Sequence, residues 1–167
     1  MLEKTFSAAR TSPCDSKRTG CHGVNRRSTI EIAEGPMPSV LIIDDDRMVR
    51  EATRILLSAR GYEVVVAENG KSGVETARSR PFDVAIVDLF MPDMDGLQVI
   101  GAIHELKPRM PMIAASGFMF GSGEAVPDMP DFSNMAAEAG AVSTLYKPFR
   151  PDALLREVAK AINLAAA

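Results

Sequence analysis

The sequence has few cysteines, no excess of positive charge and no long apolar run. Only Cys14 and Cys21 are present, so a disulfide framework is not expected and a reducing cytoplasm is the default location. The net charge of −3 gives no general reason to expect direct nucleic-acid binding, which usually requires a basic patch. No apolar stretch reaches the roughly 18 residues of a membrane span. Residues 1–20 also lack the apolar core of a signal peptide.

The rest of the composition is that of a globular protein with a polar extension. Hydrophobic residues make up 46% of the 167 residues, which is enough for one fully packed domain. Residues 1–36 are rich in Ser, Thr, Arg and Gly and bury too little apolar surface to offset their ordering entropy. We predict that 1–36 is disordered and that 37–167 is the domain. The extension could result from an upstream start codon before a natural start at Met37, or it could be a weak interaction or targeting arm.

Strand and helix patterns alternate from Ser39 almost to the C-terminus. Short apolar runs typical of buried strands are followed by segments with helical spacing, and Gly and Pro mark their ends. This alternation predicts an α/β fold with a five-stranded parallel sheet, doubly wound so that helices cover both faces. The predicted strands are 39–43, 63–67, 84–87, 112–115 and 142–146. The predicted helices are 47–60, 70 to just before Pro81, 97–106, 132–139 and 151–164.

Polar side chains stand where four of these strands end. Asp44 and Asp45 follow the first predicted strand, and Asp88, Ser116 and Lys147 follow the third, fourth and fifth. The carboxyl ends of parallel strands open into one crevice, so these five side chains should converge. Three unpaired carboxylates would repel one another, and a divalent cation removes that penalty. A few hard oxygen ligands that are open to water suit Mg²⁺.

This set of groups suits phosphoryl chemistry. Asp88 is the best candidate nucleophile, because a carboxylate can attack a phosphoryl group to give an aspartyl phosphate. Lys147 would neutralise the phosphoryl oxygens, and the Ser116 hydroxyl would donate a hydrogen bond to one of them. We also predict a cis bond between Lys147 and Pro148, since a sharp turn must aim the lysine into the crevice.

Three nearby acids are predicted to have local structural roles only. A single Asp after a strand is usually a turn former or a helix cap. We therefore predict that Asp46 caps the first helix and that Asp93 and Asp95 are turn residues.

Four short sequence segments, taken together, form a pattern that is highly specific for one protein family. They are Leu41-Ile42-Ile43-Asp44-Asp45-Asp46, Val87-Asp88-Leu89-Phe90-Met91-Pro92-Asp93-Met94-Asp95-Gly96, Ala115-Ser116-Gly117 and Lys147-Pro148-Phe149. With them, the chain from Met37 to Ala167 resembles a response-regulator receiver domain of two-component signalling, of the single-domain, chemotaxis-regulator type. The resemblance implies a flavodoxin-like (βα)5 fold.

The resemblance also implies roles for the site residues. Asp88 would accept a phosphoryl group from the phosphohistidine of a sensor histidine kinase or a histidine phosphotransfer protein. Asp45, Asp88 and the Phe90 backbone carbonyl would ligate Mg²⁺, or Mn²⁺ in its place, and Asp44 would help directly or through water. Ser116 would be the switch hydroxyl and Lys147 the phosphate-binding lysine. Such a protein is no enzyme in the usual sense, but assists its own phosphotransfer and autodephosphorylation.

The chain departs from the family pattern in two places. Thr144 stands where receivers often carry a switch aromatic, and Tyr146 is expected on the opposite face of the strand. The stretch Gly117–Asp131 is long and loop-like, and it is either functional or a tolerated surface insertion. In receivers the positions of Phe90 and Phe118 flank the path of an attacking water, which predicts a long-lived phosphoryl group. The alternative is that both rings point outward to a partner surface.

Only Ala165–Ala167 follow the last predicted helix, so we expect a stand-alone regulator. It would signal through a phosphorylation-dependent protein contact, made by 132–139, 142–146 and 151–164, or relay the phosphoryl group. One alternative is a degenerate receiver that binds partners without phosphorylation. Another is a haloacid-dehalogenase-like phosphatase, suggested by Asp44-Asp45-Asp46 after the first strand. The lack of a cap domain and of further acids soon after the lysine weighs against that enzyme.

Overall fold

The computed structural model describes residues 37–117 and 131–166. The prediction that 1–36 is disordered lies outside these residues. So does the stretch between Gly117 and Asp131, including Phe118.

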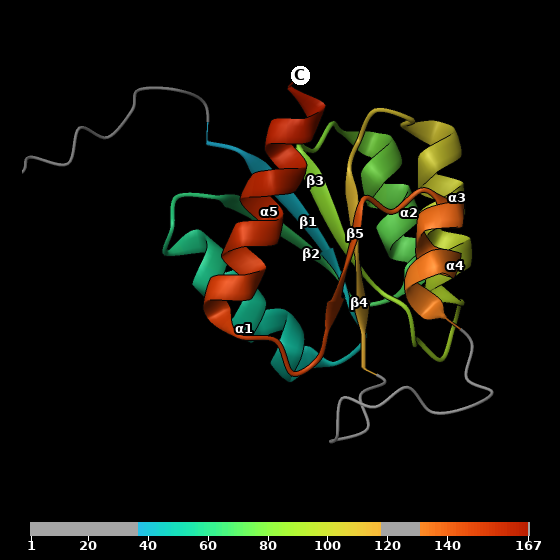
Figure 1. Cartoon of the computed structure of the whole chain (residues 1–167), viewed down its shortest axis with the longest axis horizontal. Helices are drawn as coiled ribbons and strands as arrows, with labels where there is room; N and C mark the ends of the chain where they lie inside the picture. The colour runs from blue at the N-terminus through green and yellow to red at the C-terminus, as the bar shows by residue number, and fades with distance from the viewer. Residues whose placement is uncertain (1–36, 118–130, 167) are drawn as a thin grey trace, which may run out of the picture. The chain divides into compact units, whose positions relative to one another are not determined.

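The described residues form a parallel sheet with the strand order β2-β1-β3-β4-β5 (Figure 1). The strands are β1 (Ser39–Ile43), β2 (Glu63–Ala67), β3 (Val84–Asp88), β4 (Met112–Ser116) and β5 (Ser143–Tyr146). The helices are α1 (Arg47–Ser58), α2 (Gly70–Ser79), α3 (Gly96–Leu106), α4 (Phe132–Ala139) and α5 (Pro151–Ala165). The predicted α/β class, the parallel sheet and the (βα)5 order are confirmed.

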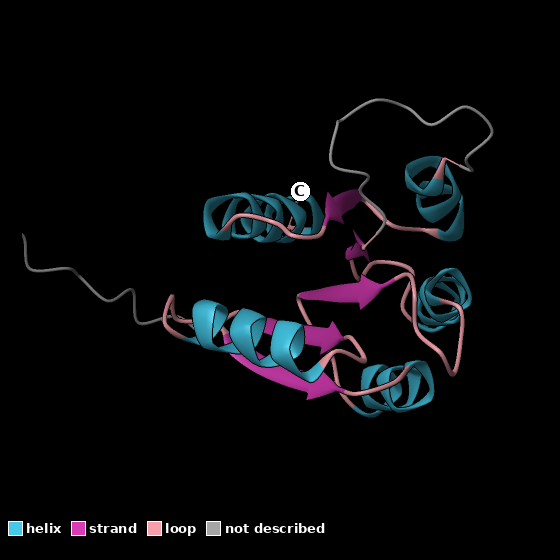
Figure 2. Cartoon of the chain, turned by 90° about the horizontal axis from the view of Figure 1, so that it is seen from below, coloured by secondary structure: helices cyan, strands magenta, loops and turns pink. Residues whose placement is uncertain are grey.

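Helices cover both faces of the sheet, with α1 and α5 on one side and α2, α3 and α4 on the other (Figure 2). Each strand therefore feeds two separate clusters of apolar side chains. In β1, Leu41 and Ile43 pack toward the three-helix side, whereas Val40 and Ile42 pack toward α1 and α5. Burial on both faces explains why the central strands read as continuous apolar runs.

Side-chain caps fix where several helices begin. Asp46 caps α1 as predicted, since its Oδ1 accepts hydrogen bonds from the N–H groups of Met48 and Val49 at 2.8 and 3.3 Å. Asp95 is the N-cap of α3 and accepts from the N–H of Leu97 at 2.9 Å, so it has a more definite role than that of a turn residue. Caps of this kind satisfy N–H groups that have no partner inside the helix.

The element boundaries differ from prediction by one or two residues at several ends. Helix α1 ends at Ser58 and not at Arg60, because the chain then turns at Gly61, whose φ is +85°. Strands β3 and β4 each run one residue further than predicted. Asp88 and Ser116 still lie in the ladder, paired with Ala115 and Tyr146.

The expected facing of Tyr146 is wrong. Thr144 pairs with Ala114 and Tyr146 with Ser116, while Leu145 between them packs into the cluster that contains α5. Side chains alternate along a strand, so residues two apart share a face. Thr144 and Tyr146 therefore both lie on the α4 side of β5, and Tyr146 is an exposed aromatic there.

None of the helices in the described part of the chain is long and apolar enough to cross a membrane.

Candidate functional site

The carboxyl ends of four strands bring the predicted site residues to one edge of the sheet. Asp44 comes directly after β1, Asp88 is the last residue of β3, Ser116 is the last of β4, and Lys147 follows β5. The register aligns these ends, because Ile43 pairs with Val87 and Asp88 with Ala115. The backbone N–H of Lys147 also donates to the carbonyl of Ser116 at 2.7 Å.

Three carboxylates form a cluster at this edge. One oxygen each of Asp44, Asp45 and Asp88 lies within 4.8 Å of the others. Asp44 and Asp88 are buried, whereas Asp45 is exposed. A few carboxylate oxygens with one side open to water fit a cation such as Mg²⁺, which keeps several of its waters when it binds protein.

Lys147 bridges the two buried acids. Its Nζ donates to Oδ2 of Asp44 and to Oδ2 of Asp88, both at 2.7 Å. The lysine side chain is only 15% exposed. Burial lowers the pKa of Lys147, but the hydrogen bonds and charges of Asp44 and Asp88 outweigh this, so the pKa lies above its usual value. The lysine is therefore an ammonium ion held among carboxylates.

In contrast to Lys147, Asp44 lies in surroundings that disfavour its charged form. Burial raises the pKa of Asp44, and the charge of Asp88 adds to this, while the Lys147 ammonium and the Asp46 N–H only partly offset the effect. The Asp46 N–H donates to Oδ1 of Asp44 at 2.9 Å. One lysine thus supplies too little positive charge to offset the burial of this carboxylate beside Asp88, and a further cation would relieve the penalty.

Both oxygens of Asp88 are held by donors. Oδ2 accepts from Lys147, and Oδ1 accepts from the backbone N–H of Phe90 at 3.2 Å. This fixes the carboxylate in one orientation at the end of β3. Ser116 is fully buried beside it at the end of β4, and the Phe90 side chain is 41% exposed. The ligand role of the Phe90 carbonyl and the switch role of Ser116 stay predictions.

The predicted cis bond between Lys147 and Pro148 is confirmed.

Arg50 belongs to the site and was missed in the sequence. From the first turns of α1, its Nη1 donates to the backbone carbonyl of Asp44 at 2.6 Å and to that of Asp45 at 3.3 Å. The guanidinium therefore holds the loop that carries both acids. A basic residue one turn into the helix that follows an acidic loop was the available signal.

Gly96 also supports the site. A Cβ at this first residue of α3 would overlap the backbone carbonyl of Asp88 and lie 2.5 Å from the Cα of Leu89. The start of α3 therefore packs directly on the backbone that carries the candidate nucleophile. Only a residue without a side chain allows that approach.

Comparison with known proteins decides the family. Residues 40–159 match the model of the response regulator receiver domain. The chain belongs to the response regulator receiver family. Receiver domains are phosphoacceptor signalling modules that bind Mg²⁺ at acidic residues, and the cluster of Asp44, Asp45 and Asp88 matches that property.

Two curated relatives show how far the receiver domain extends. The chemotaxis protein CheY of Bacillus subtilis is 32% identical over 125 residues, which cover 74% of this chain and 97% of CheY. The transcriptional regulatory protein KdpE of Mycobacterium tuberculosis is 35% identical over 133 residues, which cover 78% of this chain. The match spans only 54% of KdpE, about half the length of that relative.

Solved receiver structures have the same fold. A CheY-like receiver domain protein from Methanospirillum hungatei superposes with a TM-score of 0.69 at 27% identity, over 78% of this chain and 97% of that one. Chemotaxis protein CheY4 of Vibrio cholerae gives a TM-score of 0.65 at 28% identity, over 75% and 98%. The flavodoxin-like receiver fold is confirmed.

Proposed function

We propose that this receiver domain accepts a phosphoryl group on Asp88 from a sensor histidine kinase or a histidine phosphotransfer protein. The modified domain then signals through a phosphorylation-dependent contact with another protein or relays the phosphoryl group onward. The observation that carries this proposal is the placement of the Asp88 carboxylate, held by Lys147 beside two further acids.

The transfer would proceed by attack of an Asp88 carboxylate oxygen on phosphorus. A new O–P bond forms as the P–N bond to the donor imidazole breaks, and the imidazole leaves with the bonding electron pair. Lys147 stays protonated, and its ammonium group would neutralise charge on the transferred phosphoryl oxygens. Ser116 would donate a hydrogen bond to one of these oxygens. Catalysis of phosphoryl transfer rests mainly on such positioning and charge stabilisation.

The residues that would hold the metal are Asp44, Asp45, Asp88 and the Phe90 carbonyl. Bound there, Mg²⁺ or Mn²⁺ would neutralise charge on the phosphoryl oxygens. Asp44 would act directly or through a water. Burial is the main cause of the raised pKa of Asp44, and the charge of Asp88 adds to it, so a cation bound beside Asp44 would favour its ionised form.

Two other functions fit the sequence less well. A degenerate receiver would lack part of the acceptor set, whereas here Asp44, Asp45, Asp88 and Lys147 lie together. The family match favours a receiver over a haloacid-dehalogenase-like phosphatase. Stand-alone action, a cytoplasmic location and the absence of direct nucleic-acid contact remain part of our proposal.

Phosphorylation by a small donor tests the assignment of Asp88. Incubation with acetyl phosphate and Mg²⁺ should add one phosphoryl group by mass spectrometry, and hydroxylamine should remove it, as expected for an acyl phosphate. Asp88→Asn should abolish the addition, while Asp95→Asn, which keeps a capable helix cap, should not. Undiminished labelling of Asp88→Asn would refute the assignment. Turnover of para-nitrophenyl phosphate would instead indicate a phosphatase.

A further inference from the structure

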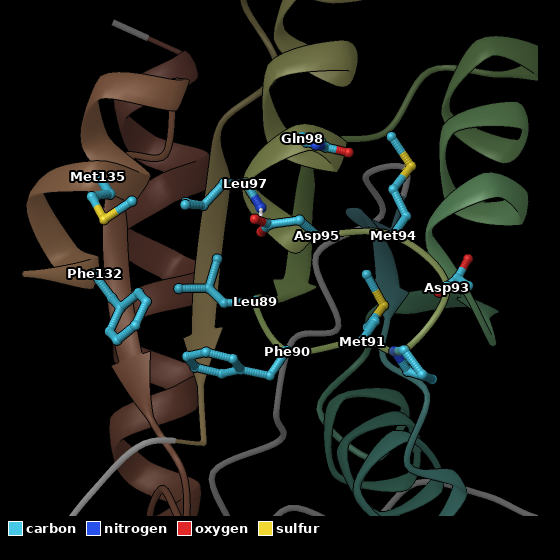
Figure 3. A pocket seen from close by; sticks show the side chains of 11 residues that line it. Leu89, Phe90, Met91, Asp93, Met94, Asp95, Leu97, Gln98, Phe132 and Met135 are labelled. Carbon is cyan, nitrogen blue, oxygen red and sulfur yellow. Dashed lines mark hydrogen bonds between the residues drawn. The ribbon is translucent and has the colours of Figure 1, made fainter. Parts of the chain in front are cut away.

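A groove of about 400 Å³ lies between the β3–α3 loop and α4 (Figure 3). Apolar side chains line both walls of the groove. Phe90, Met94 and Leu97 come from the loop and the start of α3, and Phe132 and Met135 come from α4. Phe90 and Met135 are 41% and 40% exposed, so both offer apolar surface at the groove. The volume suits one or two inserted side chains rather than a whole helix.

Two carboxylates stand at the rim of this groove. Asp93 and Asp95 both come from the β3–α3 loop, and the described residues that line the groove include no Lys, Arg or His. One Asp93 oxygen accepts from the N–H of Gly70 at 3.1 Å, and one Asp95 oxygen accepts from the N–H of Leu97. These bonds fix the positions of both acids. Asp93 also lines a neighbouring hollow together with Lys71 and Arg78, whereas Asp95 lines only the groove among the described hollows.

We propose that this groove docks an amphipathic segment of a partner protein. The segment would insert an aromatic or long aliphatic side chain between the loop and α4, and it would place an arginine or lysine against Asp93 and Asp95. Charge complementarity selects a basic partner. The flexible thioethers of Met94 and Met135 can adapt to the inserted side chain, as methionines do at many binding surfaces.

The groove shares α4 with the contact face expected from the family resemblance, but its other wall, the β3–α3 loop, is not part of that face. Val142 and Tyr146 are exposed apolar residues near β5, but neither lines the groove. On α1, Met48 is 78% exposed and likewise lies outside it. The proposal does not depend on phosphorylation of Asp88, so its failure and that of the proposed function are distinguishable.

Selection from a phage library of random 12-residue peptides tests the partner chemistry. The full chain would be immobilised with Mg²⁺, and enriched peptides would be sequenced and synthesised. We expect them to combine an aromatic or long aliphatic residue with Arg or Lys. Binding would then be measured by fluorescence anisotropy against matched methionine variants, Met135→Asp in the groove and Met48→Asp on α1.

Met135→Asp should weaken binding of the selected peptides about tenfold or more, and Met48→Asp should leave it unchanged. The double variant Asp93→Asn with Asp95→Asn retains both backbone hydrogen-bond acceptors and should weaken basic peptides about fivefold. Circular dichroism would verify that each variant is folded. The proposal is overturned if no peptide is enriched, if enriched peptides lack basic residues, or if Met135→Asp binds them as tightly as the unmodified chain.

Discussion

The rings of Phe90 and Phe132 meet edge to face, with their centroids 5.0 Å apart and their planes at 78° (Figure 3). This contact joins the loop after Asp88 to the first residue of α4. The backbone N–H of Phe90 also donates to Oδ1 of Asp88. Phe90 therefore contacts both the candidate phosphoacceptor and α4, so one residue links Asp88 to that helix.

Phe90 is also the basis of a prediction about the lifetime of the phosphoryl group. A phenyl ring two residues after the acceptor cannot position a water for in-line attack. The double variant Phe90→Asn with Phe118→Glu should dephosphorylate at least an order of magnitude faster, since positioning effects are commonly worth ~10²-fold. The decay of labelled protein over time measures this rate.

Phe132→Leu is the control for that experiment. It removes the aromatic partner of Phe90 without adding a polar group, so it should not reproduce the acceleration. An unchanged half-life in the double variant would show that the rings do not control access of water.

Metal binding should depend on Asp45. Asp45→Ala removes the exposed member of a cluster with few protein ligands, so affinity for Mg²⁺ and Mn²⁺ should be lost and phosphorylation with it. Titration followed by isothermal calorimetry measures the affinity. Asp83→Asn changes an acid at the opposite end of β3 and should bind metal normally. Equal affinities in Asp45→Ala and the unmodified chain would exclude Asp45 as a ligand.

When no metal is bound, the ionised carboxylate of Asp44 should lower the stability of the folded domain. Its pKa is raised above the ordinary 3.8, chiefly by burial, so the ionised form is less favourable in the folded than in the unfolded chain. The penalty is absent below the unfolded pKa and develops as the pH rises through the folded pKa. Asp44→Asn should therefore raise the Tm at neutral pH in chelator, and the gain should shrink on acidification.

Saturating Mg²⁺ is the internal control for this variant. The cation should stabilise the unmodified chain more than Asp44→Asn and so reduce or reverse the difference. A lower Tm for Asp44→Asn in chelator would mean that its bond to Lys147 outweighs the cost of burying the charge.

Two glycines of α3 offer a matched test of the packing beneath the site. Gly96→Ala places a methyl group against the backbone of Asp88 and Leu89, so it should destabilise the domain by about 1–3 kcal/mol. A Cβ added at Gly101 would meet no atom within 4 Å, so Gly101→Ala should stabilise the domain by about 0.5–1 kcal/mol. Urea denaturation measures both. Equal effects would show that the close approach at Gly96 does not constrain the fold.

The sequence predicted the strands, their order of alternation and the meeting of Asp44, Asp88 and Lys147, because these depend on local apolar runs and on the rule for parallel strand ends. It did not predict the contacts made by Arg50, since many surface arginines look alike before their surroundings are known. The facing of Tyr146 was wrong, although strand alternation relative to Thr144 was sufficient to predict it. The groove depends on how α4 packs against the β3–α3 loop, which no local pattern encodes.

The contact between Lys147 and Asp44 spans 103 residues of sequence, and that between Lys147 and Asp88 spans 59. At roughly 5–20 residues per second, synthesis of 59 residues takes roughly 3–12 s. A chain still on the ribosome therefore carries the acids before the lysine that completes their site. The site with both Lys147 contacts can therefore form only after synthesis has passed Lys147.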